Sequence, residues 1–174
     1  FEKANEFLDE YRTFNNLRSE RENILKQIEH KDDGRVKIIT GIRRCGKSFL
    51  LFVLYKQYLL SVGVREEQII ELSLDELQNA RYRNPFELDA HIRGKMADSR
   101  MNYYVFIDEV QFCEEIPNPY VQGSSLKITF IDTLLGLMKL PNADIYVTGS
   151  NSRMLSKDVL TQFRDRGYDI HLYP

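Results

Sequence analysis

The sequence predicts an α/β fold, a three-layer sandwich in which a doubly wound, five-stranded parallel sheet carries helices on both faces. Two observations lead to this expectation. Short runs rich in β-branched and aromatic residues recur along the 174 residues, and segments with helical spacing of apolar residues separate them. Glycine, proline and asparagine mark most of the changes from one pattern to the other.

The expected strands are short apolar segments bounded by turn residues. The first, VKIIT at residues 36–40, is β-branched and has a glycine on each side, which is typical of a buried strand. The other expected strands lie at residues 68–74, 103–107, 144–150 and 168–173.

The expected helices alternate with these strands. Residues 47–61 form the first, and Gly63 lies where a helix commonly ends. Asn84 and Pro85 are typical of a helix cap and the first helical residue, and they predict a helix that runs to about Asp98. The remaining expected elements are a loop at 113–125 and helices at 126–140 and 152–166.

The chain is expected to divide into two parts. Residues 1–30 place apolar side chains three, four or seven positions apart and alternate the sign of their charges, which predicts an amphipathic helical segment. A turn signal, Lys31-Asp32-Asp33-Gly34, follows it. Residues 31–174 then form the core domain.

Composition excludes several classes of protein. A net charge of -2 provides no overall attraction to nucleic acid or to an anionic membrane. The longest apolar run, from Phe49 to Tyr55, is far too short to cross a bilayer. Cys45 and Cys113 form no disulfide framework and fit a reducing compartment. We therefore expect a cytoplasmic protein without membrane partners.

Residues 41–48, GIRRCGKS, match the phosphate-binding pattern G-x-x-x-x-G-K-[ST]. Between a strand and a helix, the glycines allow backbone N–H groups to point inward, and the helix adds the positive end of its dipole. Lys47 would reach the β- and γ-phosphates, and the Ser48 hydroxyl would bind Mg²⁺. The alternative is a chance match in a glycine turn. The expected nucleotide-binding residues of this loop are Gly41, Ile42, Arg43, Arg44, Cys45, Gly46, Lys47, Ser48 and Phe49.

Two adjacent carboxylates end the third expected strand. Asp108 is expected to bind Mg²⁺, and Glu109 to polarise a water for attack on the γ-phosphate. The alternative is two polar residues that merely end a buried strand. Gln111 is a further candidate for positioning the water or for signalling to a neighbour.

Two further segments are candidates for contacts with the nucleotide. TGSNS at 148–152 follows the fourth strand, and Ser150 or Asn151 would either report the γ-phosphate or cap the next helix. Arg164 and Arg166 end that helix, where they would either complement its dipole or act as an arginine finger.

The segments GIRRCGKS, YYVFIDEVQ, DIYVTGSNSRMLS and FRDRGYDIHLYP together resemble the AAA-type P-loop ATP-binding proteins of the archaeal-ATPase-like group of bacteria and archaea. The resemblance covers most of residues 20–174. It implies a sheet of order 5-1-4-3-2, numbered along the chain, and a catalytic glutamate beside the Mg²⁺-site aspartate. It also implies that the full-length protein continues into a C-terminal domain of unknown function.

The resemblance selects adenine as the base and assigns residue roles. Lys47, Glu109 and Arg166 are the implied catalytic residues, and Ser48 and Asp108 the implied metal ligands. One departure concerns the arginines. Asp165 stands between them, where the family usually has glycine, and an acidic neighbour could hold Arg164 or Arg166 away from a phosphate.

The function expected from these residues is Mg²⁺-dependent ATP binding and hydrolysis that couples nucleotide state to conformational change. The alternatives are a slow nucleotide-gated switch that binds a protein partner, an ATPase linked to DNA, and, with less support, a phosphoryl-transfer kinase. ATP and ADP are the expected ligands. Self-association, a protein partner and DNA stay open.

Overall fold

The computed structural model describes residues 36–41, 46–123, 125–150 and 167–172. All of them belong to a unit that spans Asp32–Pro174, separate from Phe1–Lys31. Four expected features lie outside the described residues: the helical segment of residues 1–30, the turn at 31–34, loop residues 42–45 and the helix 152–166. Within the described part, no helix combines the length and hydropathy needed to cross a membrane.

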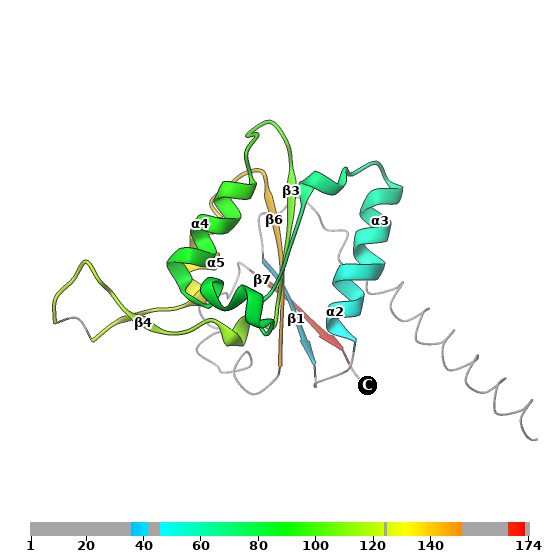
Figure 1. Cartoon of the computed structure of the whole chain (residues 1–174). Coiled ribbons are helices and arrows are strands. Elements are labelled where there is room, and N and C mark those ends of the chain that lie inside the picture. The colour runs from blue at the N-terminus through cyan, green and yellow to red at the C-terminus, as the bar shows by residue number, and fades with distance from the viewer. Residues whose placement is uncertain (1–35, 42–45, 124, 151–166, 173–174) are drawn as a thin grey trace, which may run out of the picture. The chain divides into compact units, whose positions relative to one another are not determined.

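A five-stranded parallel sheet forms the middle of the unit (Figure 1). Its strand order is β2-β3-β6-β1-β7, so β6 pairs with both β1 and β3. The strands are β1 Val36–Gly41, β2 Ile69–Ser73, β3 Tyr103–Asp108, β6 Ala143–Ser150 and β7 Gly167–Leu172. The predicted α/β fold with a parallel sheet is confirmed.

Helices cover both faces of this sheet (Figure 1). On one face a continuous helical segment comprises α2 (Lys47–Phe49), a π-helical stretch (Leu50–Tyr55) and α3 (Lys56–Ser61), which together span the predicted helix 47–61. On the other face lie α4 (Pro85–Lys95) and α5 (Phe130–Leu137). Short 3-10 helices at Glu66–Gln68, Leu77–Arg83 and Val110–Phe112 complete the described helical structure.

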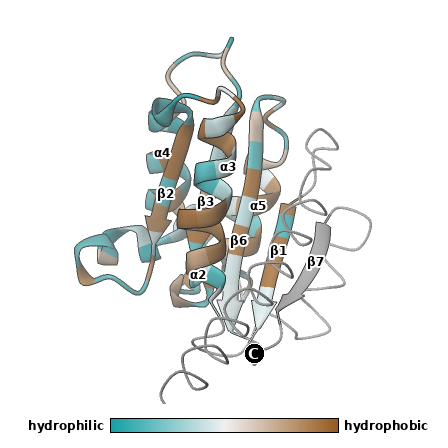
Figure 2. Ribbon diagram, turned by 90° about the vertical axis from the view of Figure 1, so that its right-hand side faces the viewer, coloured by the Kyte–Doolittle hydropathy of each residue, from teal (hydrophilic) through white to brown (hydrophobic). Residues whose placement is uncertain are grey.

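Alternating side chains on the strands form the cores between these layers. The cluster beneath α4 and α5 takes alternate residues of β2 and β3, such as Leu72 and Ile107, and closes against Leu88 and Leu134. The opposite side chains of β3 and β6, including Phe106 and Tyr146, are buried on the face of α2 and α3. Strand β2 is coloured mainly as hydrophobic in Figure 2.

Capping residues fix where the two helices of one face begin. The Asn84 side chain accepts hydrogen bonds from the N–H groups of Phe86 and Glu87 at 3.0 and 3.4 Å, with Pro85 as the first helical residue, so this predicted cap is confirmed. Thr129 caps α5 by accepting a hydrogen bond from the Ile131 N–H at 3.2 Å.

The predicted helix 126–140 is wrong at its start. Residues Lys127–Ile128 form strand β5, which pairs antiparallel with β4 at Ile116–Pro117, so helix α5 begins only at Phe130. The predicted loop 113–125 therefore also contains a short strand. The physical reason is that the pairing with β4 keeps β5 extended, and the Thr129 cap then sets the start of the helix.

A buried polar network joins β1, β6 and the π-helical stretch. The Lys37 ammonium lies 2.6 Å from one Asp144 oxygen, and the Tyr146 hydroxyl donates to the other at 2.6 Å. The Tyr55 and Tyr146 hydroxyl oxygens are also 2.6 Å apart. Since the Tyr146 proton goes to Asp144, Tyr55 is the donor in that pair. Burial raises the pKa of both tyrosines.

We expect Lys37→Met to lower the free energy of unfolding by about 3 kcal/mol, because it leaves the Asp144 carboxylate without its cation in a mostly buried position. Lys56→Met is the matched control. It breaks pairs with Glu66 and Glu71 that are more exposed, and it should cost less than about 1 kcal/mol. Urea denaturation measures both. Equal losses in the two variants would contradict the role assigned to the network.

Candidate functional site

The loop after β1 leads into the helical segment at Gly46. This residue has φ 88° and ψ 20°, in the left-handed region where a side chain would cause strain. The helix begins immediately after it at Lys47, so its first N–H groups lack intrahelical acceptors. Such a helix start favours a bound anion.

Lys47 lies buried at this helix start. Its side chain is 3% exposed, and its ammonium donates a hydrogen bond at 3.1 Å to the carbonyl oxygen of Gly41, the last residue of β1. The side chain therefore turns back toward the beginning of the loop. The buried Lys47 cation and the helix N-terminus thus place positive charge beside the loop.

The Asp108 carboxylate lies at the end of β3 and joins three segments of the chain. One oxygen accepts a hydrogen bond at 2.7 Å from the Ser48 hydroxyl of α2. The other accepts a hydrogen bond from the Thr148 hydroxyl of β6. Burial raises the pKa of the Asp108 carboxyl above its ordinary value, although the hydrogen bonds from Thr148 and Ser48 oppose this shift.

Glu109 follows with an unusual backbone conformation. Its φ of 53° makes it the one non-glycine residue with positive φ among the described residues. The Glu109 N–H donates at 3.0 Å to the Thr148 hydroxyl, and its carboxylate accepts a hydrogen bond from the Gln111 side-chain amide. A strained residue that neighbouring groups hold in place is typical of functional sites.

Thr148 lies in the candidate segment TGSNS, but the sequence predicted no separate role for it. Its hydroxyl accepts from the Glu109 N–H and donates to Asp108, so it holds both acidic residues. The sequence does carry a signal for it. Thr148 and Ser150 lie two positions apart at the carboxyl end of β6, so both side chains are on the same face of the sheet. Because β6 lies between β1 and β3, this places them beside the ends of both strands.

The structure brings together the principal predicted site residues. Ser150 ends β6 opposite Gly41 in the register of the sheet. Phe49 lies in the first turn of the helix with 43% of its surface exposed. The predicted residues that lie outside the described part of the chain are Ile42, Arg43, Arg44, Cys45, Asn151, Arg164 and Arg166.

These groups fit a magnesium-bound phosphate. The Ser48 hydroxyl and the Asp108 carboxylate offer the hard oxygen ligands that Mg²⁺ requires. The raised pKa of Asp108 reflects a buried negative charge, which a divalent cation would relieve. Lys47 and the helix start supply positive charge for the phosphate oxygens.

A family model described as an AAA domain matches residues 33–174. The chain belongs to the AAA domain family. Members of this family are in general nucleotide-binding ATPases, and the predicted resemblance to AAA-type ATP-binding proteins is confirmed.

Two relatives of this AAA domain are uncharacterized proteins. One, from Haemophilus influenzae, is 34% identical over 158 residues, and the other, from Methanocaldococcus jannaschii, is 26% identical over 145 residues. The matches cover 88% and 80% of this chain. The chain spans only 35% and 26% of the lengths of these relatives.

Solved structures share the fold at low sequence identity. PCH-2 of C. elegans has a TM-score of 0.57 and 13% identity, with 87% of this chain and 42% of that chain covered. A DNA polymerase III gamma subunit-related protein of Thermotoga maritima has a TM-score of 0.56 and 12% identity, with 88% and 46% covered. At these identities the similarity establishes the fold of the AAA domain alone.

We expect Asp108→Asn to raise the thermal stability of the ligand-free AAA domain at neutral pH. Because the pKa of Asp108 is raised in the folded state, its protonated form favours folding, and this contribution is lost as the pH rises through the raised pKa. The gain from asparagine should therefore be largest above that pKa and vanish in acid, where the wild-type carboxyl is protonated.

Melting temperatures across a pH series test this expectation. Asp89→Asn is the matched control, since Asp89 forms a surface ion pair with Arg93 at 2.8 Å, and its loss should change stability by less than about 0.5 kcal/mol. A loss of stability in Asp108→Asn at neutral pH would contradict the claim that the buried, ionised Asp108 carboxylate destabilises the ligand-free fold.

Proposed function

We propose that this AAA domain binds ATP with Mg²⁺ and hydrolyses the β–γ phosphoanhydride bond. The observation that carries the proposal is the convergence of Ser48, Asp108 and Thr148 beside Lys47 and Glu109. Ser48, Asp108 and Thr148 come from α2, β3 and β6. An ordinary core would have no reason to bury a lysine and an aspartate at one sheet end, with a half-buried glutamate beside them.

Each group has a role in nucleotide binding. Lys47 and the backbone of residues 41–49 would hold the phosphates, and Ser48 and Asp108 would hold Mg²⁺. The metal, when bound, supplies positive charge that neutralises the phosphate oxygens. Thr148 is a positioning residue, because its hydroxyl fixes the Asp108 carboxylate and the Glu109 backbone together. Ser150, opposite Gly41, is proposed to contact the γ-phosphate.

Glu109 is the proposed general base. A water oxygen forms a bond to the γ-phosphorus while the bond from that phosphorus to the β–γ bridging oxygen breaks. The electron pair of the broken bond leaves on ADP, and the Glu109 carboxylate accepts the proton of the water. In the present structure Gln111 donates to one oxygen of this carboxylate, and an ionised carboxylate keeps further acceptor sites for the water.

The sheet supports assignment to a particular group of P-loop proteins. The pairing of β6 with both β1 and β3 is in accord with the order 5-1-4-3-2. In the group of P-loop proteins that this chain resembles, that order accompanies a catalytic glutamate beside the metal-site aspartate, and we assign this role to Glu109. Arg166 is the proposed arginine finger, acting in this chain or on a neighbouring copy. It differs from the family pattern in having Asp165 as its neighbour in place of glycine. A cytoplasmic location stays a prediction, which the free thiol of Cys113 supports.

Hydrolysis is proposed to change the conformation of the whole protein. This chain spans 35% and 26% of the lengths of the two relatives, and the activity of a whole protein of that length is part of the proposal. DNA is not proposed as a partner, because the net charge of -2 provides no general attraction to phosphates.

We expect Glu109→Gln to lower the rate of ATP hydrolysis by about 10²–10⁴-fold, since the amide cannot accept the proton of the water. ATP affinity should stay within about threefold of wild type, because glutamine keeps the size of the side chain and removes no phosphate ligand. Phosphate release and nucleotide titration measure the two quantities.

Glu115→Gln is the matched control, because Glu115 is exposed and lies six residues along the chain from the proposed base. Its hydrolysis rate should equal that of wild type. Equal turnover in Glu109→Gln would overturn the role of Glu109. ATP binding by wild type without hydrolysis at any protein concentration would instead favour the slow nucleotide-gated switch.

A further inference from the structure

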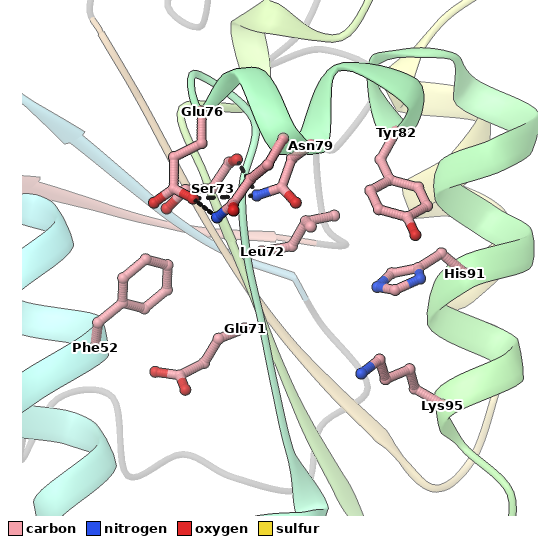
Figure 3. Close-up of a pocket in the computed structure, with 10 residues that line it drawn as sticks. Phe52, Glu71, Leu72, Ser73, Glu76, Asn79, Tyr82, His91 and Lys95 are labelled. Atoms are coloured by element: carbon pink, nitrogen blue, oxygen red, sulfur yellow. Dashed lines mark hydrogen bonds between the residues drawn. The ribbon is translucent and has the colours of Figure 1, made fainter.

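A groove runs along the free edge of the sheet beside β2 (Figure 3). Its volume is about 560 Å³. Phe52 and Glu71 line it on the side of the π-helical stretch, and Tyr82, His91 and Lys95 line it on the side of α4. The two helical layers thus extend past the sheet edge, and β2 lies at the bottom of the groove between them.

The hydrogen bonds of β2 show which backbone groups face β3. The Leu74 N–H donates at 3.1 Å to the carbonyl oxygen of Asp108. In a parallel pair, alternate residues direct both their N–H and C=O groups to the same neighbour. With the register that pairs Ser73 with Asp108, the residues directed to β3 are Ile70, Leu72 and Leu74.

The intervening residues of β2 therefore direct their backbone groups into the groove. The Ser73 carbonyl oxygen demonstrates this direction, because it accepts a hydrogen bond at 2.8 Å from the Asn79 side chain instead of pairing in the sheet. No described strand other than β3 pairs with β2. The groove floor thus presents the N–H of Ser73 and the N–H and C=O of Glu71. The C=O of Ile69 continues the same edge of β2 beyond the residues that line the groove.

The walls of the groove are partly aromatic. The rings of Tyr82 and His91 lie 4.0 Å apart between centroids, at an interplanar angle of 31°. Burial, and then the charge of Lys95, lower the pKa of His91 below its ordinary value. Phe52 lies on the opposite wall (Figure 3). Side chains that alternate along an added strand would contact these two walls in turn.

Opposite charges mark the two ends of the groove. Glu76 lies at one end and Lys95 at the other (Figure 3). Within the described part of the chain, neither has an oppositely charged group within ion-pair distance, and Glu76 accepts hydrogen bonds only from the amides of Gln78 and Asn79. Glu71, in contrast, is paired with Lys56 at 2.7 Å.

We propose that this groove binds an extended peptide segment of a partner protein as an additional strand on β2. The alternating N–H and C=O groups of the floor match the edge of a peptide strand, which is the basis of recognition by strand addition. The charges match a peptide with a basic side chain near Glu76 and an acidic one near Lys95. Nucleic acid fits less well, because its phosphates would meet Glu71 and Glu76.

The test uses the full chain without nucleotide, so that its outcome is independent of the proposed ATPase. The probes are acetylated and amidated peptides of sequence Lys-Val-Thr-Val-Glu and the reverse, Glu-Val-Thr-Val-Lys. We expect one of them to bind and to shift the amide NMR signals of Glu71 and Ser73. The variant Glu76→Lys combined with Lys95→Glu should reverse the preference between the two peptides.

Backbone methylation of the better peptide is the decisive control, since it leaves the protein unchanged. Methylating the amide nitrogens along one edge of the peptide should weaken binding at least about tenfold, whereas methylating those of the other edge should not. Equal binding by both methylated forms, or no shift with either peptide at millimolar concentration, would overturn the proposal.

Hydrogen exchange of the chain alone gives a second test. The amides of Glu71 and Ser73 should exchange rapidly with solvent and become protected when the peptide binds. Protection already present without peptide would overturn the proposal, because another occupant would fill the groove. Dependence of that protection on protein concentration would identify the occupant as a second copy, and independence would identify another segment of this chain.

Discussion

The contact on which the site depends is the Asp108 carboxylate held between the hydroxyls of Ser48 and Thr148. It joins the helix after the loop, the third strand of the sheet and the strand inserted between β1 and β3. Burying this charge destabilises the ligand-free domain, since burial raises the pKa of the carboxyl. The ligand-free domain is therefore less stable than it would be with a bound cation. Such destabilisation is typical of a site that is organised before its ligand binds.

The parallel sheet determines where these site residues lie relative to one another. Parallel strands bring their carboxyl ends to one edge, where ligands of open α/β sheets bind. Lys37, Asp144 and Tyr146 form a buried network on β1 and β6, the two strands that also carry Gly41 and Thr148. At the outer edge, Asn79 covers only the Ser73 carbonyl oxygen of β2 and leaves the neighbouring groups exposed to the groove. The proposed nucleotide and peptide sites therefore lie at different edges of the same sheet.

The parts of the fold and site that the sequence predicted are those set by local pattern. The strands, the Asn84 cap and the loop-to-helix junction at Gly46 all follow from the order of a few neighbouring residues. Contacts between segments that are distant in the sequence could not be predicted in the same way. Thr148 lies in the candidate segment TGSNS, and the implied strand order places β6 beside β3. Its own role was not predicted, because its hydrogen bonds with Asp108 and Glu109 depend on side-chain positions that no local pattern encodes. The start of α5 was misplaced because β5 pairs with β4, and the groove depends on how far two helical layers extend beyond β2.

The central claim is that Lys47, Ser48 and Asp108 form a site for a magnesium-bound triphosphate. Calorimetric titration with ATP, in Mg²⁺ and in EDTA, tests it most directly on wild type, Lys47→Ala and the exposed-lysine control Lys139→Ala. The prediction is Mg²⁺-dependent binding by wild type and by the control, with affinity at least about thirtyfold weaker in Lys47→Ala. Absence of ATP binding by wild type, or equal affinity in all three proteins, would contradict the claim.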